Sequence, residues 1–245
     1  IASDIYTWNK QSIPSDSPVK LVKTLIQQNM CPAIIFCMSR KRCVHMAESF
    51  TQSLMVSSRP MKTKDVIDIE YDAQVVDWNK EVFSHRQHFY GLVKKYLNPW
   101  RKHLEELPQY KAFLELLYKG VAYHHSGMIP VLREFVEILF REKMIMAVFA
   151  TESLGVGIDM PARTVVFTQL NKPTGDNFET RNLQTHEFMQ MAGRAGRRGK
   201  DKKGYVVYYP YPPGKGGITY QEFKHIVMGN PPKADSQLEI TCDFV

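Results

Sequence analysis

Residues 145–168 read Ile-Met-Ala-Val-Phe-Ala-Thr-Glu-Ser-Leu-Gly-Val-Gly-Ile-Asp-Met-Pro-Ala-Arg-Thr-Val-Val-Phe-Thr. Two largely apolar runs of strand length, 145–150 and 164–168, flank a glycine-containing segment with one turn near Ser153. Short apolar runs bounded by turn residues are typical of strands buried inside a sheet. This stretch therefore predicts two buried strands.

The alternation of strands and helices continues on both sides of this stretch. Ser39 is expected to be the N-cap of one helix, because its hydroxyl can accept a hydrogen bond from the first helical turn. Strands that alternate with helices predict an α/β fold, with a parallel sheet covered by helices on both faces. The expected helices span residues 19–28, 40–52, 131–140 and 185–192, and the further strands span residues 33–38, 121–124 and 205–209.

One long connection, residues 51–119, interrupts this pattern. A link between a helix and a strand usually needs only a few residues, so this one must have structure of its own. We expect a mainly helical insertion whose apolar stripe packs on the rest of the fold, rather than a dedicated partner site. The stripe consists of Trp78, Val82, Phe89, Val93 and Tyr96, and prolines 99 and 108 break the helical pattern.

A cluster of arginines and glycines follows the helix expected at 185–192. Residues 190–199 read Gln-Met-Ala-Gly-Arg-Ala-Gly-Arg-Arg-Gly. Arginine offers a planar fork of donors that matches phosphate oxygens, and glycines let a ligand approach the backbone closely. Arg194 and Arg197 would share one face if the helix continued through them. The alternative is a solvated basic loop or a nuclear-localisation-like run, since lysines follow at 200, 202 and 203.

The composition indicates a globular chain with a polyanionic partner. The 245 residues are 44% hydrophobic and carry a net charge of +7. Segment 193–204 contributes six basic residues against the single acid Asp201. Positive charge concentrated in one place suits a nucleic acid or a nucleotide.

Cysteine spacing and hydropathy narrow the class of protein further. The four cysteines form no Cys-x-x-Cys pair, so buried free thiols are expected rather than a metal-binding knuckle. The longest apolar run, near residues 144–150, is far shorter than the roughly 20 residues of a membrane span. We expect an intracellular protein, with nucleus and cytoplasm both left open.

Four segments, read together, resemble the motifs of one enzyme family. Residues 150–167 resemble motif V of superfamily 2 helicases, residues 190–197 resemble motif VI, and residues 33–43 are similar to motif IV. Residues 124–130, His-His-Ser-Gly-Met-Ile-Pro, resemble the sequence between motifs IV and V in the superkiller-like, exosome-associated group of DExH-box RNA helicases. The motifs occur in the family's order and cover about three quarters of the chain. The resemblance implies a RecA-like fold, with motifs IV, V and VI beyond the carboxyl ends of the strands.

Two motifs that a helicase needs do not occur in this sequence. It contains neither a Gly-x-x-x-x-Gly-Lys-Ser/Thr loop to cradle phosphates nor an Asp-Glu pair to hold magnesium. The chain also begins at Ile1 without an initiator methionine. We therefore expect residues 1–245 to be the second, C-terminal RecA-like lobe of a larger protein, with the helical insertion at 51–119 inside it. Residues 230–245 resemble the start of the family's linker to a following winged-helix domain.

The resemblance assigns the nucleotide side of motif VI. Arg197 would be the arginine finger, a cation delivered across a domain cleft to the γ-phosphate of ATP. Arg194 would assist it, and Gln190 would contact the γ-phosphate or its attacking water. Arg198 would face solvent or RNA.

The same resemblance gives motif V a part in nucleotide binding. Gly155 and Gly157 would permit a tight turn at the mouth of the cleft, and Asp159 would accept a hydrogen bond from the ribose of ATP. The nearest group has asparagine where this chain has Asp159, although other superfamily 2 branches have aspartate. Alternatively, Asp159 caps the turn before Pro161.

The RNA side is assigned to motifs IV and V. Thr151 would contact an RNA phosphate through its hydroxyl and backbone, aided by Ser153, and Ser39 and Arg40 would act similarly. Phosphate contacts of this kind carry no sequence information, so we expect little base preference from this lobe.

The pair His124 and His125 raises the alternative of a metal site. Adjacent residues on a strand point to opposite faces, and no third ligand is near in sequence, so we expect no metal here. By resemblance, His125 and Ser126 lie in the region of the RNA path, and a packed, hydrogen-bonded histidine is expected for one of the pair.

Together these features predict the C-terminal lobe of an ATP-dependent RNA helicase that hydrolyses nothing alone. ATP would be its nucleotide, with Mg²⁺ held mainly by an N-terminal lobe of the same protein. Its expected partners are single-stranded RNA and RNA-exosome or other helicase-complex subunits, in RNA processing or decay. Two alternatives stay open, a DNA-unwinding or spliceosomal relative and a non-catalytic RNA-binding scaffold lobe.

Overall fold

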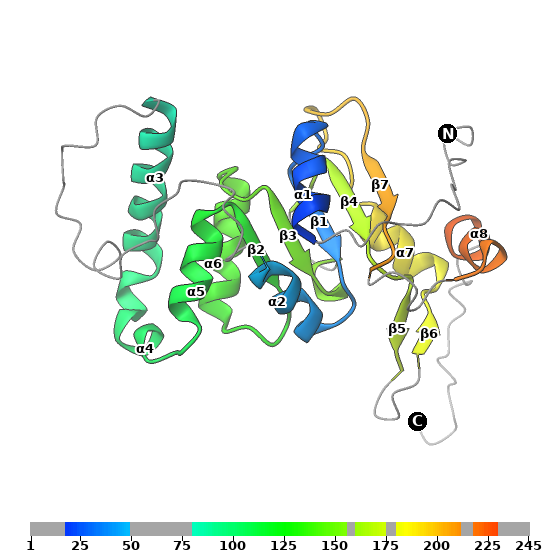
Figure 1. The fold of residues 1–245 in the computed structure, drawn as a ribbon, viewed down its shortest axis with the longest axis horizontal. Coiled ribbons are helices and arrows are strands. Elements are labelled where there is room, and N and C mark those ends of the chain that lie inside the picture. The colour runs from blue at the N-terminus through cyan, green and yellow to red at the C-terminus, as the bar shows by residue number, and fades with distance from the viewer. Residues whose placement is uncertain (1–17, 50–79, 156–159, 175–179, 212–217, 230–245) are drawn as a thin grey trace, which may run out of the picture.

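A five-stranded parallel sheet forms the centre of the molecule (Figure 1). The computed structural model describes residues 18–49, 80–155, 160–174, 180–211 and 218–229. The strands lie in the order β2-β3-β1-β4-β7, and every neighbouring pair is parallel. This confirms the predicted α/β fold. The strands are β1 (Ala33–Phe36), β2 (Val121–His124), β3 (Ala147–Ala150), β4 (Thr164–Phe167) and β7 (Tyr205–Tyr208).

Strands β1 to β4 are buried along their whole length. Their sequences are nearly continuous apolar runs, as expected for parallel strands that are covered on both faces. The register aligns Ile35 with Phe149 and Val166 in one row across the central strands. The next row, which points to the opposite face, contains Phe36 and Phe167, whose rings stack with their centroids 5.6 Å apart.

Helices cover both faces of the sheet. On the face of Ile35, helix α5 (Tyr110–Tyr118) brings Phe113 edge-on against Tyr123 of β2, with ring centroids 5.2 Å apart. On the opposite face, helix α7 (Thr185–Ala192) stacks Phe188 on Phe167, with ring centroids 4.8 Å apart. The helices flanking the sheet are α1 (Pro18–Gln27), α2 (Arg40–Glu48), α5 (Tyr110–Tyr118), α6 (Pro130–Arg141), α7 (Thr185–Ala192) and α8 (Tyr220–Met228).

The described part of the insertion is helical. It forms α3 (Lys80–Tyr96), the 3-10 turn η2 (Asn98–Trp100), α4 (Arg101–Glu105) and then α5. Phe89 is buried against Tyr118 of α5, and the ring of Tyr96 lies 6.5 Å from that of Phe135 on α6. The stripe therefore packs as core where it is described, and the side chains of residues 78 and 82 lie outside the described residues. Figure 1 shows α3 on the outer side of α5 and α6.

Two elements were not anticipated from the sequence. A short antiparallel hairpin, β5 (Asn171–Pro173) with β6 (Thr180–Asn182), leads from β4 into α7. Helix α8 begins at a capping box in which the Thr219 hydroxyl accepts from the backbone N–H of Glu222 and the Glu222 carboxylate accepts from that of Thr219. It packs beside α7 and places Phe223 against Tyr208 of β7 at 5.9 Å. The strands of the hairpin have only three residues each, too short to show a periodicity.

The cysteines agree with the sequence where they are described. Cys37 and Cys43 are buried free thiols, Cys31 is half-buried and free, and Cys242 lies outside the described residues. Burial raises the pKa of the Cys31 thiol to about 11, so it stays protonated at neutral pH. Within the described residues, no helix is both long and apolar enough to cross a membrane.

Candidate functional site

The residues assigned from motifs IV, V and VI lie at two opposite edges of the sheet. Ser39 of motif IV and Thr151 of motif V follow the carboxyl ends of β1 and β3, as predicted, and Ser126 follows the carboxyl end of β2. The arginine loop, residues 193–201, lies instead at the amino ends of β4 and β7, so its expected place at the carboxyl edge was wrong. The backbone N–H of Ala162, just before β4, donates to the carbonyl of Arg194 at 2.9 Å.

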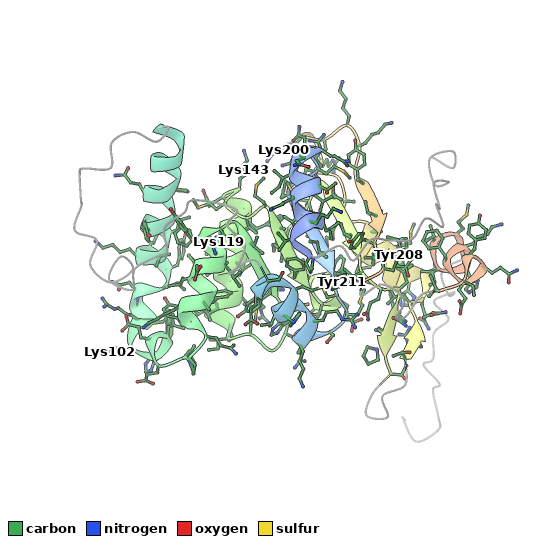
Figure 2. The ribbon with its side chains drawn as sticks, in the orientation of Figure 1. Lys102, Lys119, Lys143, Lys200, Tyr208 and Tyr211 are labelled. Carbon is green, nitrogen blue, oxygen red and sulfur yellow. The ribbon has the colours of Figure 1, made fainter. Side chains whose placement is uncertain are left out.

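The direction of α7 explains this displacement. The helix begins beside the carboxyl end of β4, where the N–H of Leu183 donates to the carbonyl of Leu170, and it ends beside the amino end of the same strand. It therefore carries the chain across the sheet before the arginines begin. Figure 2 shows Lys200 of the arginine loop at the upper edge of the sheet and Tyr211, which follows β7, farther down.

The helix also ends before the arginines, so Arg194 and Arg197 do not share a helical face. Helix α7 ends at Ala192, and the chain continues in turns with Gly196 at φ +89°. The N–H of Gly196 donates to the carbonyl of Ala162 at 2.7 Å, which pins the loop to the chain before β4. A side chain at Gly204 would place its Cβ 2.5 Å from the backbone carbon of Ala195, so only glycine fits this crossing.

One carboxylate holds the guanidinium of Arg197. Asp201 accepts from Arg197 Nε at 2.7 Å, from Nη2 at 2.8 Å and from the backbone N–H at 3.1 Å. The Asp201 side chain is only 5% exposed, and Arg163 Nε lies 4.0 Å from it. The hydrogen bonds from Arg197 are the largest cause that lowers the pKa of Asp201 to about 2. The pair is therefore charged at neutral pH, and this contact was not foreseen from the sequence.

The other predicted nucleotide-side residues differ in their surroundings. Gln190 is exposed on the last turn of α7, and Arg194 is half-buried just beyond the helix. Gly155 ends the 3-10 turn η3 (Glu152–Gly155) that follows β3. Gly157 and Asp159 lie outside the described residues.

At the carboxyl edge, motif IV meets the segment after β2. Ser39 caps α2, its hydroxyl accepting from the backbone N–H of Arg42, which confirms the predicted cap. Arg40 is exposed, and its Nη2 donates to the hydroxyl of Ser126 at 3.0 Å. A Cβ at Gly127 would lie 3.3 Å from both Arg40 Nη1 and His125 Nδ1, so these groups converge on one spot.

The two histidines point to opposite sides of the sheet, as predicted. His124 is 1% exposed and its Nε2 lies 3.0 Å from a carboxylate oxygen of Glu137 on α6. His125 stacks on Tyr123 with ring centroids 5.8 Å apart. Burial is the largest cause that lowers the pKa of both histidines, and the nearby Arg40 lowers that of His125 further. Among the residues that the structure describes, no three His, Cys, Asp or Glu side chains are grouped to hold a metal ion.

The predicted phosphate contacts of motif V gather directly after β3. The hydroxyls of Thr151 and Ser153 lie 2.9 Å apart, and the backbone N–H of Thr151 donates to the carbonyl of His124 at 3.2 Å. Thr151 is 9% exposed, so its hydroxyl is held rather than free to rotate in solvent.

A network of ion pairs near this turn was missed from the sequence. Lys172 of β5 lies between Glu152 of η3 and Glu187 of α7, at 2.7 Å from each carboxylate. Arg181 of β6 donates to both oxygens of Glu187 at 2.7 and 2.8 Å. The acid at the third position of α7 was a usable signal for a capping interaction, and the backbone N–H of Gln184 does donate to Glu187 at 2.9 Å. The pairing across the hairpin had no such signal.

Comparison with known proteins defines the class. Residues 96–199 match the helicase conserved C-terminal domain. The chain is 36% identical over 195 residues to the DExH-box ATP-dependent RNA helicase DExH10 of Arabidopsis thaliana, covering 79% of this chain and 17% of that protein. It is 37% identical over 188 residues to the exosome RNA helicase MTR4 of Homo sapiens, covering 77% and 16%. It is 30% identical over 226 residues to the antiviral helicase SKI2 of Saccharomyces cerevisiae, covering 92% and 15%.

The parallel sheet, the order of the motifs and these matches agree. The chain is a helicase C-terminal lobe with a RecA-like fold. It belongs to the superkiller-like group of superfamily 2 DExH-box RNA helicases. The chain spans about a sixth of the length of the curated relatives it matches.

Proposed function

We propose that this lobe closes against an N-terminal lobe of the same protein and supplies the arginine finger for RNA-stimulated ATP hydrolysis. The observation that carries the proposal is the arginine loop, which is pinned to the sheet by backbone hydrogen bonds and carries both Arg194 and Arg197. Phosphoryl transfer needs positioned positive charge more than covalent chemistry, and an arginine delivered in this way contributes ~10³ to 10⁵ in rate. The N-terminal lobe would bring the phosphate loop and hold Mg²⁺.

In this proposal, Asp201 keeps Arg197 oriented before the lobes close. The Asp201 carboxylate accepts hydrogen bonds from Nε and Nη2 of Arg197. No bond to Asp201 is observed for the third guanidinium nitrogen, Nη1. A γ-phosphate that arrives across the cleft would contact this nitrogen while Asp201 keeps its hold on the other two. Gln190, exposed on the preceding helical turn, would contact the γ-phosphate or its attacking water. Motif V, with Gly155, would line the cleft mouth.

RNA would bind along the opposite, carboxyl edge of the sheet. Arg40 and Ser126 are already joined there, and the hydroxyls of Thr151 and Ser153 are paired nearby. These groups suit phosphate oxygens and do not read bases, so we propose binding of single-stranded RNA with little base preference. His125 lies near Arg40 and would add no competing positive charge there, because burial and the arginine lower the pKa of its imidazole.

The names of the relatives suggest the biological setting. The human relative is an exosome RNA helicase and the yeast relative is an antiviral helicase. We therefore propose that the protein serves RNA processing or decay, together with an RNA-degrading complex. Unwinding would follow from repeated closure and opening of the two lobes on ATP binding and hydrolysis.

The test is ATP hydrolysis by the full-length protein in the presence of single-stranded RNA. Arg197→Ala should lower the RNA-stimulated rate by at least two orders of magnitude, while RNA affinity stays unchanged. Arg198→Ala is the matched control, because Arg198 is the next residue and is exposed. Circular dichroism would establish that both variants are folded.

The same measurement also distinguishes the proposed ATPase from the main alternative, a non-catalytic RNA-binding scaffold. An unmutated protein that binds RNA but hydrolyses no ATP would favour the non-catalytic scaffold. An equal loss of rate in both variants would assign the effect to the general charge of the loop and would contradict the finger role of Arg197.

A further inference from the structure

We propose that Lys172 couples RNA binding to ATP hydrolysis by tying the turn η3, which contains Ser153 and directly follows Thr151, to helix α7. Lys172 would be a positioning residue, since it contacts neither the proposed phosphate site nor the finger. The inference rests on the proposed function, because it presumes an RNA edge and a nucleotide edge within this lobe. It goes further by naming the contact that joins them.

Lys172 is built as a bridge rather than as a surface charge. Its Nζ lies 2.7 Å from a carboxylate oxygen of Glu152 and 2.7 Å from one of Glu187. The side chain is 19% exposed, although it sits on a three-residue strand at the rim of the fold. One ammonium thus joins two acids from elements that are 35 residues apart in sequence.

At one end of the bridge, Glu187 is locked to the start of α7. Arg181 holds both of its oxygens in a fork, and the N–H of Gln184 donates to it at 2.9 Å. Bidentate pairing of this kind fixes geometry as well as charge. The hydrogen bond from Arg181 is the largest cause that lowers the pKa of Glu187 to about 2, so this anchor stays charged. A displacement of Glu187 would therefore displace the first turn of α7.

At the other end, Glu152 lies between the two residues proposed to contact RNA. The hydroxyls of Thr151 and Ser153 are 2.9 Å apart, so a phosphate that binds both would set the conformation of the turn. The turn and α7 also lie side by side. A change at the turn can therefore reach α7 through Lys172 and through packing.

Helix α7 completes the path because it spans the sheet. The helix begins at the carboxyl edge, near Lys172, and ends at Ala192. Two residues later, the carbonyl of Arg194 accepts a hydrogen bond from the backbone N–H of Ala162 at the amino edge. A rigid helix that is anchored at both edges moves as a unit. RNA at one edge would thus bias the position of the arginine loop at the other.

The experiment compares basal and RNA-stimulated ATP hydrolysis in the full-length protein, with an oligouridine as the RNA. Lys172→Met should lower the stimulation factor roughly two- to five-fold, the scale of one partly exposed ion pair, with the basal rate and RNA affinity unchanged. Glu152→Gln leaves the pair of Lys172 with Glu187 intact and should give the same loss. The double variant should lower the stimulation factor no more than either single variant does, because both substitutions break the same ion pair between Lys172 and Glu152.

Lys119→Met is the matched control. Lys119 is 14% exposed and pairs with Glu115 at 2.9 Å, but it lies on the side of the sheet that carries the insertion (Figure 2). Unchanged stimulation in Lys172→Met, in a protein whose unmutated form is stimulated by RNA, would overturn the bridge and leave the proposed function intact. Additive losses in the double variant would also overturn it. No stimulation in the unmutated protein would count against the proposed function itself.

Discussion

The two edges of the sheet handle positive charge in different ways. At the amino edge, Arg197 is held by a carboxylate that is 5% exposed, and the loop around it is fixed by backbone hydrogen bonds. At the carboxyl edge, Arg40 is exposed and is held by one neutral hydroxyl. A charge-assisted fork holds a guanidinium more tightly than a single neutral partner does. The amino edge is therefore suited to a ligand at one fixed position, and the carboxyl edge to a ligand whose position can vary.

This contrast fits what each ligand would require. A γ-phosphate presents one group in one place, so the donor must be positioned before it arrives. An RNA backbone repeats, and its phosphates are bound without regard to sequence. Substitutions at the amino edge should therefore change the rate of ATP hydrolysis, and substitutions at the carboxyl edge should change how strongly RNA stimulates it.

The largest effect is expected in the hydrophobic core between β1, β4 and α7, which supports both edges of the sheet. Phe167 stacks between Phe36 and Phe188 and is fully buried. Phe167→Ala should lower the free energy of unfolding by about 3–5 kcal/mol, measured by urea denaturation, because it leaves a cavity under β1, β4 and α7. Met189→Ala, on the exposed side of α7, should change it by less than about 0.5 kcal/mol. Similar losses for both variants would contradict the buried position of Phe167 between Phe36 and Phe188.

The next effect tests the carboxylate at the amino edge. Asp201→Asn should lower RNA-stimulated ATP hydrolysis by about 10- to 100-fold, because hydrogen bonds to a charged group contribute about 1.5–3 kcal/mol. RNA affinity should not change. In an Arg197→Ala background the same substitution should have no further effect on the rate, since Asp201 acts through that arginine. A full additional loss there would mean that Asp201 has another role.

A smaller effect is expected at the carboxyl edge. Thr151→Ala removes one neutral hydroxyl, so RNA stimulation should fall roughly 2- to 10-fold and more than the basal rate does. Thr24→Ala is a suitable control, because its hydroxyl bonds within α1, to the carbonyl of Lys20. Equal loss of basal and stimulated rates would move Thr151 to the nucleotide side.

Salt provides a finer test of the same edge. RNA affinity should fall with rising salt, and Arg40→Gln should reduce the slope of log affinity against log salt by about 0.7, the value for one phosphate of a single strand. Arg101→Gln, in an exposed pair with Glu105, should leave the slope unchanged. Fluorescence anisotropy with a labelled oligouridine measures both. Identical slopes for all three proteins would remove Arg40 from the interface.

Acid should release two carboxylates, Glu187 in the first turn of α7 and Asp201 in the loop that follows this helix. The pKa values of Glu187 and Asp201 are each lowered to about 2, so the stability they contribute is present above the pKa of the unfolded chain, near 4, and is lost as pH falls toward 2. Glu187→Gln should therefore flatten the decrease in unfolding free energy between pH 5 and pH 2, measured by urea denaturation. Glu134→Gln, on an exposed part of α6, is the control. Parallel curves for Glu187→Gln and the unmutated protein would contradict the anchoring.

The elements that the sequence predicted well are those with a strong local pattern. β2 begins and ends at the predicted residues, and the helix at 185–192 has the predicted bounds, because buried parallel strands and amphipathic helices each leave a periodic signal. The hairpin β5–β6 was missed because three-residue strands leave none. The helix was not continued through Arg194 because the backbone there bonds instead to Ala162, which is 32 residues away.

The candidate site divides in the same way. The arginine and hydroxyl residues proposed to bind phosphate were visible in the motifs, and the N-cap role of Ser39 was predicted from its position alone. The bond from Arg40 to Ser126 joins residues 86 apart, so no local pattern predicts it. The pair of Arg197 with Asp201 is local, with i,i+4 spacing, and this spacing was a usable signal that was missed from the sequence.

By itself, the sequence determined the class of fold, the family and the chemical character of both motif clusters, because apolar periodicity and arginine-glycine spacing are local properties of the chain. Only the tertiary structure decided that these clusters lie on opposite edges of one sheet. The reason is geometric, since α7 must run antiparallel to the strands it covers and so carries the arginines across the sheet. It also decided how Lys172 is paired, because this residue meets Glu152 and Glu187 only when the hairpin, the turn η3 and α7 have been brought together.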